Sequence, residues 1–373
     1  MLSFWETTQL TRFDLVVIGG GLVGLSTAIH YRKDNPEARI AILERGVFPS
    51  GASTKNAGFL CFGSIDELSD HLEEMTQEEL LTLVERRYRG GLRLRELLGD
   101  QRIGYEPCGG YELHTHQLDH TVIERFNDML RPLFAENVYQ DASHEIQSKG
   151  FSSDRVTSLI RNQFEGVIHT GKMIRAYQEM ALEHGIMTFT QTECHQYYEK
   201  EDAVDVEITH LGERMTLSTQ KLALCTNAFT SRWLPKEDIT PGRGLVFVTK
   251  PRKGVDLRGC FHYNSGYNYF RSVEGRLLLG GGRHLDKETE STTDPGINQH
   301  IYNALVRDMH EMISPDEALD IDQVWSGVMA FGTTKEPIVK KVSDRIALGA
   351  RLGGMGVALG TEVGFDVAAL LTT

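Results

Sequence analysis

The first strong pattern in the chain is a pair of short apolar runs with a helical repeat between them. Residues 13–19 (FDLVVIG) and 39–44 (RIAILE) are rich in aliphatic and β-branched side chains, as buried strands of a parallel sheet are. Residues 22–33 carry apolar side chains at the helical period. The opening of the chain therefore predicts a β-turn-α-β unit.

Alternating strands and helices return in the middle and at the end of the chain, whereas strands dominate residues 242–282 and include a tight turn at Glu274-Gly275. Short apolar runs predict a buried strand at 221–226, after a hairpin that ends near Leu217, and another strand at 345–350. Apolar residues at helical spacing predict helices at 77–98, 118–134, 172–184, 297–312 and 357–371.

These two kinds of region predict two domains, which a chain of 373 residues is long enough to form. The α/β segments can share one sheet, and the strand-rich insertions can build a second, antiparallel sheet. We place the first domain at residues 1–85, 150–235 and 340–373, and the second at residues 86–149 and 236–339.

A glycine-rich turn, Gly19-Gly20-Gly21-Leu22-Val23-Gly24, joins the first strand to the first helix with the spacing G-x-G-x-x-G. In that context the first glycine allows the sharp turn, the second lets a pyrophosphate approach the backbone, and the third permits close packing of the helix on the strand. The helix N-terminus offers unpaired N–H groups to the anion. Glu44 stands about 20 residues further on, where a carboxylate accepts hydrogen bonds from both ribose hydroxyls, which argues against NADP as the ligand.

A longer set of motifs points to one family. The stretches are, in order, DLVVIGGGLVGLSTA, ILERGVFPSGASTKNAGF, ALCTNAFT, PGRG, YFR followed by GRLLLGGGR, and VWSGVMAF. They resemble the D-amino-acid oxidase family of FAD-dependent oxidoreductases, which includes glycine oxidase and sarcosine oxidase, and the resemblance covers essentially the whole chain. It implies an α/β fold, with a discontinuous FAD-binding Rossmann-like domain and an antiparallel-sheet α+β substrate domain. The flavin would lie at the domain interface, and the antiparallel domain would hold the substrate above the ring.

The resemblance also implies positions for individual residues. Ser53 and Thr54 should contact the pyrophosphate, residues 56–58 should pass beside the isoalloxazine, and residues 226–228 should lie near the adenosine half. At the C-terminal end, a glycine turn before a helix recreates an anion-binding N-terminus, whose N–H groups would face the flavin pyrimidine carbonyl and favour the reduced flavin. The expected cofactor residues are Gly19, Gly21, Leu22, Val23, Gly24, Glu44, Arg45, Ser53, Thr54, Lys55, Asn56, Ala57, Gly58, Thr226, Asn227, Ala228, Gly353, Gly354, Met355, Gly356 and Val357.

Candidate substrate residues gather in the strand-rich region. Strand alternation places Tyr267, Tyr269 and Arg271 on one face, with His262 nearby in the sequence. An arginine can clamp a carboxylate with two hydrogen bonds, and tyrosine hydroxyls can orient an amine. Tyrosine and arginine on a half-buried sheet face also serve in packing, so this interpretation competes with a structural one.

Two departures from the relatives bear on chemistry. Glycine and D-amino-acid oxidases carry a carboxylate-binding arginine on the strand after the Trp, where this chain has Met329, so we expect Arg271 to anchor any carboxylate instead. Sarcosine oxidase has an oxygen-activating lysine and a cysteine that binds the flavin covalently, where this chain has residues 277–279 and 328–329. We therefore expect non-covalent FAD and leave the electron acceptor unknown.

Composition narrows the partners. A formal net charge of −13 disfavours nucleic acids and anionic membrane surfaces, which leaves a small-molecule amine or amino acid as substrate. Five widely separated cysteines without C-x-x-C spacing indicate a reducing cytoplasm, and no apolar run is long enough to span a membrane. His114, His116 and His120 lie on a polar stretch, so we expect them to be solvated and expect no metal site.

The leading hypothesis is an FAD-dependent oxidoreductase that oxidises the C–N bond of an amine or amino acid by hydride transfer to flavin. One alternative is a dehydrogenase of a 2-hydroxy acid or another alcohol, because a fold does not fix its chemistry. In that case a base such as His262 or His284 would remove the hydroxyl proton. Another alternative is the flavin subunit of a multi-component or tRNA-modifying system, although the acidic charge counts against RNA.

Overall fold

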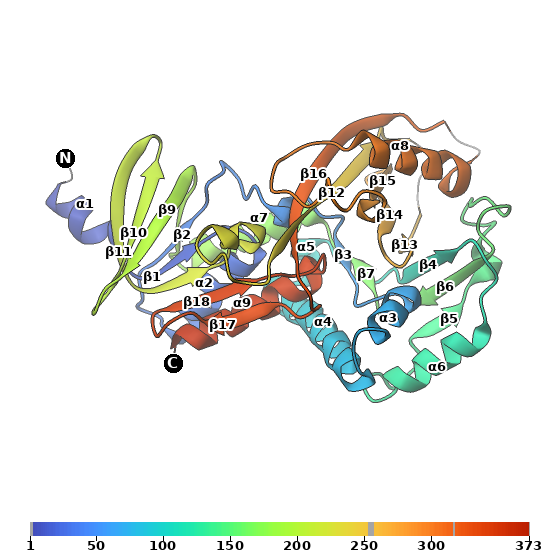
Figure 1. Cartoon of the computed structure of the whole chain (residues 1–373), viewed down its shortest axis with the longest axis horizontal. Helices are drawn as coiled ribbons and strands as arrows, with labels where there is room; N and C mark the ends of the chain where they lie inside the picture. The colour runs from blue at the N-terminus through green and yellow to red at the C-terminus, as the bar shows by residue number, and fades with distance from the viewer. Residues whose placement is uncertain (1–2, 253–256, 316–317, 373) are drawn as a thin grey trace.

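The computed structural model describes residues 3–252, 257–315 and 318–372. Within these ranges the strands form two eight-stranded sheets and one two-stranded sheet (Figure 1). The first large sheet and both chain ends lie on the left of Figure 1, and the second large sheet lies on the right. The sequence prediction of an α/β fold with two main sheets is confirmed.

The first sheet is built from segments that are far apart in the sequence, because its central strand β1 pairs in parallel with both β2 and β11, and β18 pairs in parallel with β11. The opening β-turn-α-β unit is confirmed. The predicted hairpin end and the buried run to residue 226 are instead one continuous strand, β11. The strands are β1 (Arg12–Ile18), β2 (Ile40–Leu43), β8 (Met187–Phe189), β9 (Thr192–Glu199), β10 (Val204–His210), β11 (Glu213–Leu224), β17 (Ile338–Lys341) and β18 (Ile346–Ala350).

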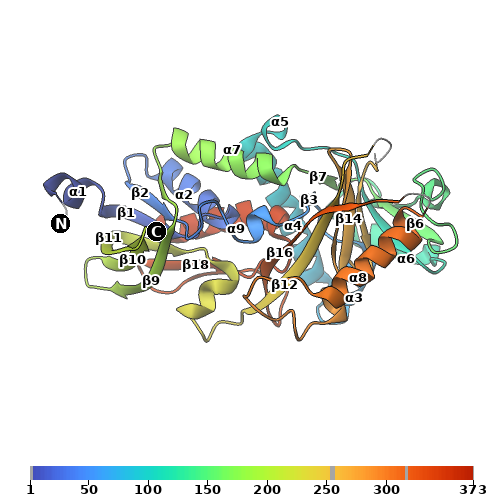
Figure 2. The same cartoon turned by 90° about the horizontal axis from the view of Figure 1, so that it is seen from above.

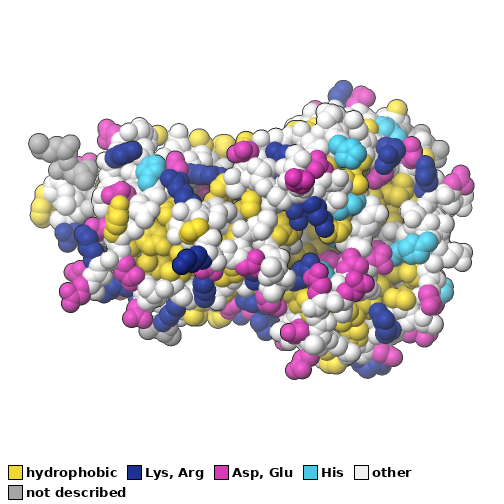
Figure 3. Space-filling model, in the orientation of Figure 1, with side chains coloured by type: hydrophobic (Ala, Val, Ile, Leu, Met, Phe, Trp, Pro, Cys, Tyr) yellow, Lys and Arg dark blue, Asp and Glu magenta, His cyan; other side chains and the backbone are white. Residues whose placement is uncertain are grey.

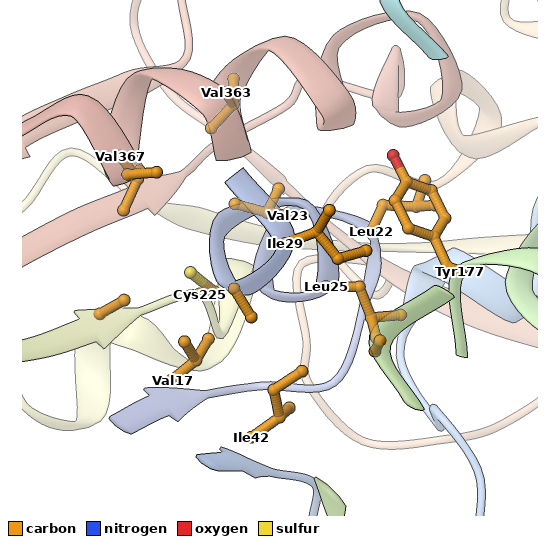
Figure 4. Packing of buried hydrophobic residues seen from close by; sticks show 14 of the residues in the cluster. Val17, Leu22, Val23, Leu25, Ile29, Ile42, Tyr177, Cys225, Val363 and Val367 are labelled. Atoms are coloured by element: carbon orange, nitrogen blue, oxygen red, sulfur yellow. The ribbon is translucent and has the colours of Figure 1, made fainter. Parts of the chain in front are cut away.

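Three helices, α2 (Leu22–Asp34), α7 (Thr170–Glu183) and α9 (Gly356–Thr372), lie on one side of this sheet (Figure 2). Figure 4 shows their apolar side chains meeting those of β1 and β2 in one core. Helices α2 and α9 approach closely, since a Cβ atom on Gly364 would lie 2.4 Å from the Cβ atom of Ser26. This contact keeps the N-termini of both helices at the same edge of the sheet.

The second sheet runs β16-β12-β15-β14-β13-β4-β6-β5 and is antiparallel except between β13 and β4. Glu274 and Gly275 both have positive φ (50° and 72°), as a two-residue hairpin turn between β14 and β15 requires, so the predicted tight turn is confirmed. The strands are β4 (Gly110–His114), β5 (Tyr139–Asp141), β6 (Ser158–Asn162), β12 (Thr240–Thr249), β13 (Cys260–Tyr263), β14 (Asn268–Val273), β15 (Arg276–Gly281) and β16 (Ile321–Phe331).

Short elements connect the two large sheets. Strands β3 (Phe59–Leu60) and β7 (Gly166–Val167) form the two-stranded sheet between them. The other helices are α1 (Phe4–Gln9), α3 (Ile65–Leu72), α4 (Gln77–Leu98), α5 (Asp100–Ile103), α6 (His120–Leu130) and α8 (Gln299–Asp308), and the 3-10 turns include η1 (Ala52–Thr54), η3 (Asn227–Arg232) and η4 (Arg283–Leu285).

The predicted domain borders differ from the observed elements at three points. Residue 86 lies inside α4, which continues because Gly90 packs against the carbonyl of Ala358 in α9. Strand β6 belongs to the second sheet, although residues 150–235 were assigned to the first domain. Strand β17 joins the first sheet from residue 338, just before the predicted border at 340. Pairing between distant strands decides to which sheet each of these strands belongs.

Two further features concern membrane-spanning helices and disulfides. No helix in the described ranges is both long and apolar enough to cross a bilayer. The five cysteines carry free thiols and form no disulfide within the described part of the chain.

Candidate active site

A cavity of about 950 Å³ lies where the first sheet meets the second, and both contribute to its walls. This volume is at the upper end of the roughly 300–1,000 Å³ of small-molecule and cofactor sites. Figure 3 shows a recess on this face, with Lys and Arg side chains on one side and a group of Asp and Glu side chains on the other. The cavity is therefore large, shared between the sheets and bordered by both signs of charge.

The glycine-rich turn forms one end of the cavity. Gly19 has φ 108°, and a Cβ atom there would lie 2.4 Å from the carbonyl oxygen of Cys225. A Cβ atom on Gly24 would lie 1.9 Å from the carbonyl oxygen of Gly19, so this glycine serves the close packing of α2 on β1. Gly21 faces the cavity, where a Cβ atom would come within 2.7 Å of Ser53 Oγ. Glycine is therefore required at Gly19 and Gly24 for close backbone packing, and at Gly21 to leave the backbone open to the cavity.

The N-terminus of α2 is an anion cradle. Gly21 is the N-cap residue and provides no side chain to the first turn. The N–H of Leu22 donates to Ser53 Oγ at 3.0 Å, so Ser53 already lies against the helix end. Unpaired N–H groups at a helix N-terminus bind phosphate groups well, and the donor set at this turn fits a pyrophosphate.

Glu44 follows β2 and is buried against the same turn. Its Oε2 accepts from the N–H of Gly20 at 3.1 Å, and its Oε1 accepts from the N–H of Gly46 at 2.8 Å and from Ser50 Oγ at 2.9 Å. These bonds fix the carboxylate at the cavity wall. Each carboxylate oxygen has two acceptor sites, so Oε2 keeps capacity for a ribose hydroxyl.

Three of the expected cofactor residues do not line the cavity. Gly24 serves packing, as described above. The hydroxyl of Thr54 donates to the carbonyl of Pro49 at 2.7 Å, so its pyrophosphate contact stays a prediction. Ala228 is fully buried in the core of the first sheet. The expected residues that do line the cavity are Gly19, Gly21, Leu22, Val23, Glu44, Arg45, Ser53, Lys55, Asn56, Ala57, Gly58, Thr226, Asn227, Gly353, Gly354, Met355, Gly356 and Val357.

The turn before α9 also lines the cavity. Gly353 and Gly354 have φ values of 57° and 86°, which favour glycine, and nothing lies within 4 Å of a Cβ atom built on Gly353. Helix α9 starts at Gly356, so its first N–H groups border open space. Together with the turn before α2, this arrangement supplies a second helix end to the same cavity, and the two ends fit the two parts of an FAD.

The wall formed by the second sheet contains two of the four predicted substrate residues, one buried (His262) and one half-buried (Tyr269). His262 on β13 and Tyr269 on β14 both line the cavity, and Phe59 lies between them, with ring centroids 5.1 and 5.8 Å away. Burial lowers the pKa of His262 to about 4 and raises the pKa of Tyr269 to about 12. The imidazole is therefore neutral near pH 7. Among the described residues, Nε2 of His262 has no hydrogen-bond partner.

Tyr267 and Met329 also line the cavity. Tyr267 precedes β14 and is partly exposed, with its ring 4.9 Å from that of His284. Met329 on β16 lies beside the turn before α9, since a Cβ atom on Gly354 would be 3.9 Å from its sulfur. The position where relatives carry a carboxylate-binding arginine is thus apolar in this chain.

Arg271 does not line the cavity, so the structure contradicts the prediction that it anchors a carboxylate there. Its Nη1 donates to the carbonyl oxygen of Ile168 at 2.8 Å and more weakly to those of Ala57 and Gly58 at 3.3 and 3.5 Å. Alternation correctly puts Arg271 on the same side of β14 as Tyr269, but backbone carbonyls cover it. It joins the second sheet to the loop beside the cavity.

Sequence reasoning missed an ion-pair network on α3 and α4 at the cavity wall. Arg87 Nη1 donates to Glu67 Oε1 at 3.0 Å and to the carbonyl of Phe62 at 2.9 Å, and His71 Nε2 lies 3.5 Å from the same carboxylate oxygen. Arg87 and His71 hold the pKa of Glu67 below its usual value despite burial. A long helix with many charges looks solvent-facing, and only the fold reveals that Arg87 faces inward.

His114 is buried, so the prediction that this histidine is solvated is wrong. Its Nδ1 lies 3.3 Å from Asp66 Oδ2, and its Nε2 lies 3.7 Å from Glu112 Oε2. Burial lowers the pKa of His114, but Asp66 and Glu112 outweigh this and raise it. Burial also raises the pKa of Glu112 to about 7, and the imidazole between the two acidic side chains offsets part of their buried charge.

Known proteins resemble this chain over almost its whole length. A family model described as FAD dependent oxidoreductase matches residues 14–370. The fold is similar to a glycine oxidase from Geobacillus kaustophilus (20% identity, 97% of this chain and 95% of that chain, TM-score 0.77). It is also similar to an L-proline dehydrogenase from P. horikoshii (17%, 96% and 93%, 0.77) and an iminodiacetate oxidase from Chelativorans sp. BNC1 (16%, 95% and 94%, 0.76). A search of curated proteins gives no match.

Proposed function

Because the chain belongs to the family of FAD-dependent oxidoreductases, we propose that it oxidises the C–N bond of an amine or amino acid to an imine. Bound FAD supplies an acceptor for the hydride that leaves the carbon. The nitrogen loses a proton, the C–N bond becomes a double bond, and water then converts the imine into a carbonyl compound and a free amine or ammonia. The remaining task of the protein is to bind, orient and desolvate the substrate.

The observation that carries this proposal is the neutral wall of buried His262 and half-buried Tyr269 beside the predicted flavin position. An amine can release hydride only when its nitrogen lone pair is free, and burial favours the uncharged amine. Arg87 compensates the charge of Glu67, so this carboxylate does not hold a nearby ammonium in its charged form. The unpartnered Nε2 of His262 can accept or donate one hydrogen bond at the substrate, depending on its tautomer.

The alcohol or 2-hydroxy acid alternative needs a stronger base. A hydroxyl group must lose its proton as the hydride leaves, and His262 is the candidate in the buried wall. With a pKa of about 4, its imidazole is a poor acceptor for a hydroxyl proton near neutral pH. The amine proposal avoids this step, since a neutral amine already has a free lone pair.

The test is anaerobic flavin bleaching with purified protein. We expect a yellow protein that releases intact FAD on acid precipitation, because no cysteine stands where sarcosine oxidase attaches its flavin. Amines or amino acids should bleach the flavin, whereas 2-hydroxy acids should not. Bleaching by hydroxy acids alone would support the dehydrogenase alternative. Bleaching that requires a cell extract would support a flavin subunit of a multi-component system. The rate at which air reoxidises the reduced flavin, compared with the rate for an artificial dye, shows whether oxygen is the electron acceptor. The cytoplasmic location stays a prediction.

A further inference from the structure

Arg283 is a partly buried cation at the cavity wall, and no described residue forms an ion pair with it. It follows β15 as the first residue of η4 and lines the cavity. Its Cζ lies 4.1 Å from the centroid of the Phe331 ring, a cation–π contact. Burial lowers the pKa of Arg283, which reflects the cost of a charge removed from water. Glu290 is close enough to raise the pKa of Arg283, but its carboxylate is paired with Arg243 at 2.8 Å.

The other cations of the cavity are compensated in different ways. Arg87 pairs with Glu67 at 3.0 Å, and Arg232 pairs with Glu193 at 2.6 Å. Lys335 is exposed, so water compensates its charge. Arg45 and Lys55 belong to the segments expected at the cofactor, and the guanidinium of Arg45 lies over the ring of Phe229 at 3.9 Å. Among the described residues that line the cavity on the side of the second sheet, Arg283 is the arginine without an ion pair.

The packing around the Arg283 guanidinium fixes its position. A Cβ atom on Gly242 would lie 2.4 Å from Phe331 Cε2 and 3.3 Å from Arg283 Cζ, so any larger residue would displace the ring and press on the guanidinium. Gly281 and Gly282 have φ values of 111° and 75° and turn the chain after β15. These glycines let Arg283 lie across the end of β16.

The position of Arg283 relates directly to Met329. Met329 and Phe331 are two residues apart on β16 and both line the cavity; Ala330 between them borders it too, but its side chain is fully buried. Two residues along a strand span about 6.7 Å. The Arg283 guanidinium therefore lies one same-face position along β16 from the place where relatives carry their arginine. Tyr267, close enough to affect the pKa of Arg283, lines the cavity beside it.

We propose that Arg283 holds a carboxylate of the substrate, which makes the substrate an amino acid or another amine with a carboxylate rather than a simple amine. The proposal rests on the proposed C–N oxidation and names its substrate class. A guanidinium binds a carboxylate through two parallel N–H donors, and the Tyr267 hydroxyl can add a third. The carboxylate supplies the counter-ion that the protein itself does not place at Arg283.

The test compares Arg283→Met and Arg283→Lys with Arg307→Met. Arg307 is an exposed arginine of α8 that lies outside the cavity, so its variant controls for the loss of one charge in the same sheet region. The first readout is the flavin absorbance change on titration with benzoate, a carboxylate without an amine, which needs no turnover. The second is anaerobic flavin reduction by amino acids and by the amines that lack only the carboxylate, such as proline and pyrrolidine. FAD content and the circular dichroism spectrum report folding.

We expect benzoate to bind the wild-type protein, and Arg283→Met to raise its Kd and the half-saturating amino-acid concentration by about 30-fold or more. Arg283→Lys should keep part of the affinity, Arg307→Met should match wild type, and reduction by simple amines should be slow and independent of Arg283. Equal binding in Arg283→Met and wild type, or no benzoate binding at all, would overturn the proposal. If dithionite bleaches the flavin but no amine or amino acid does, the C–N oxidation fails, while the benzoate titration still decides the role of Arg283.

Discussion

Replacement of Arg271 by methionine separates the sequence-based role of this residue from the role that the structure gives it. Arg271 is only 6% exposed, and its Nη1 donates to the carbonyl oxygens of Ile168, Ala57 and Gly58. Methionine keeps much of the length and apolar contact but removes the donors. We therefore expect Arg271→Met to weaken the junction between β14 and the loop at residues 56–58, without a direct effect on substrate affinity.

The size of the effect follows from the contacts. The Ile168 bond at 2.8 Å is short, whereas the other two, at 3.3 and 3.5 Å, are weak. One good hydrogen bond to a charged group contributes about 1.5–3 kcal/mol, so the free energy of unfolding should fall by about that amount. With an unfolding entropy of about 2.1 cal/mol/K per residue, a chain of 373 residues should lose roughly 2–4 °C in Tm.

The assay has three parts: urea unfolding, the Kd of FAD from flavin fluorescence, and the substrate dependence of anaerobic bleaching. We expect lower stability and weaker FAD binding, because Ala57 and Gly58 line the cavity, and an unchanged half-saturating substrate concentration in the protein saturated with FAD. The reasoning is refuted if Arg271→Met keeps its stability and FAD affinity but loses affinity only for substrates with a carboxylate. Arg271 would then be the anchor that the sequence indicates.

Three other changes test the site and its surroundings. Gly21→Ala should lower the FAD content, because its Cβ would lie 2.7 Å from Ser53 Oγ; if Ser53→Gly restores FAD in the double variant, the crowding is against Ser53 and not the cofactor. Glu44→Ala should weaken FAD binding and remove the stability that FAD adds, about 2.7 kcal/mol at 100 times Kd, measured as Tm with and without FAD; an unchanged FAD affinity would exclude Glu44 as the ribose acceptor. Burial raises the pKa of Glu165 from 4.5 to about 8. Because the folded state then binds the extra proton, wild type should lose stability relative to Glu165→Gln as pH rises between these values, by roughly 1.4 kcal/mol per pH unit in urea unfolding. A pH-independent difference would contradict that pKa.

Local patterns predicted the elements whose signals lie within a few residues. Helix α4 has the predicted bounds because Thr76 and Glu79 form a capping box at its start and Gly99 has positive φ at its end. The β-turn-α-β opening follows from buried runs around three glycines. By contrast, the sequence pattern divides β11 in two, since most of the strand mixes exposed and buried residues and only its last three residues form a fully buried run. The place of β6 depends on partners about 20 to 50 residues away, which its own five residues do not encode.

Arg271 and Arg283 show where sequence reasoning on the site reaches its limit. Alternation along β14 correctly puts Tyr269 and Arg271 on one side, but it does not say what lies across from that side. Tyr269 contacts Phe59 and still lines the cavity, whereas Arg271 is covered by the carbonyl of Ile168 and does not line it. Arg283 follows two glycines with positive φ, outside any regular strand, so no periodicity marks it. Its exposure to the cavity depends on the pairing of β12 with β16, which places Gly242 where the Phe331 ring and the guanidinium need space. Contacts between distant strands therefore decide which arginine can bind a substrate. The absence of an arginine at residue 329 helps to locate the substrate anchor only when these contacts are known.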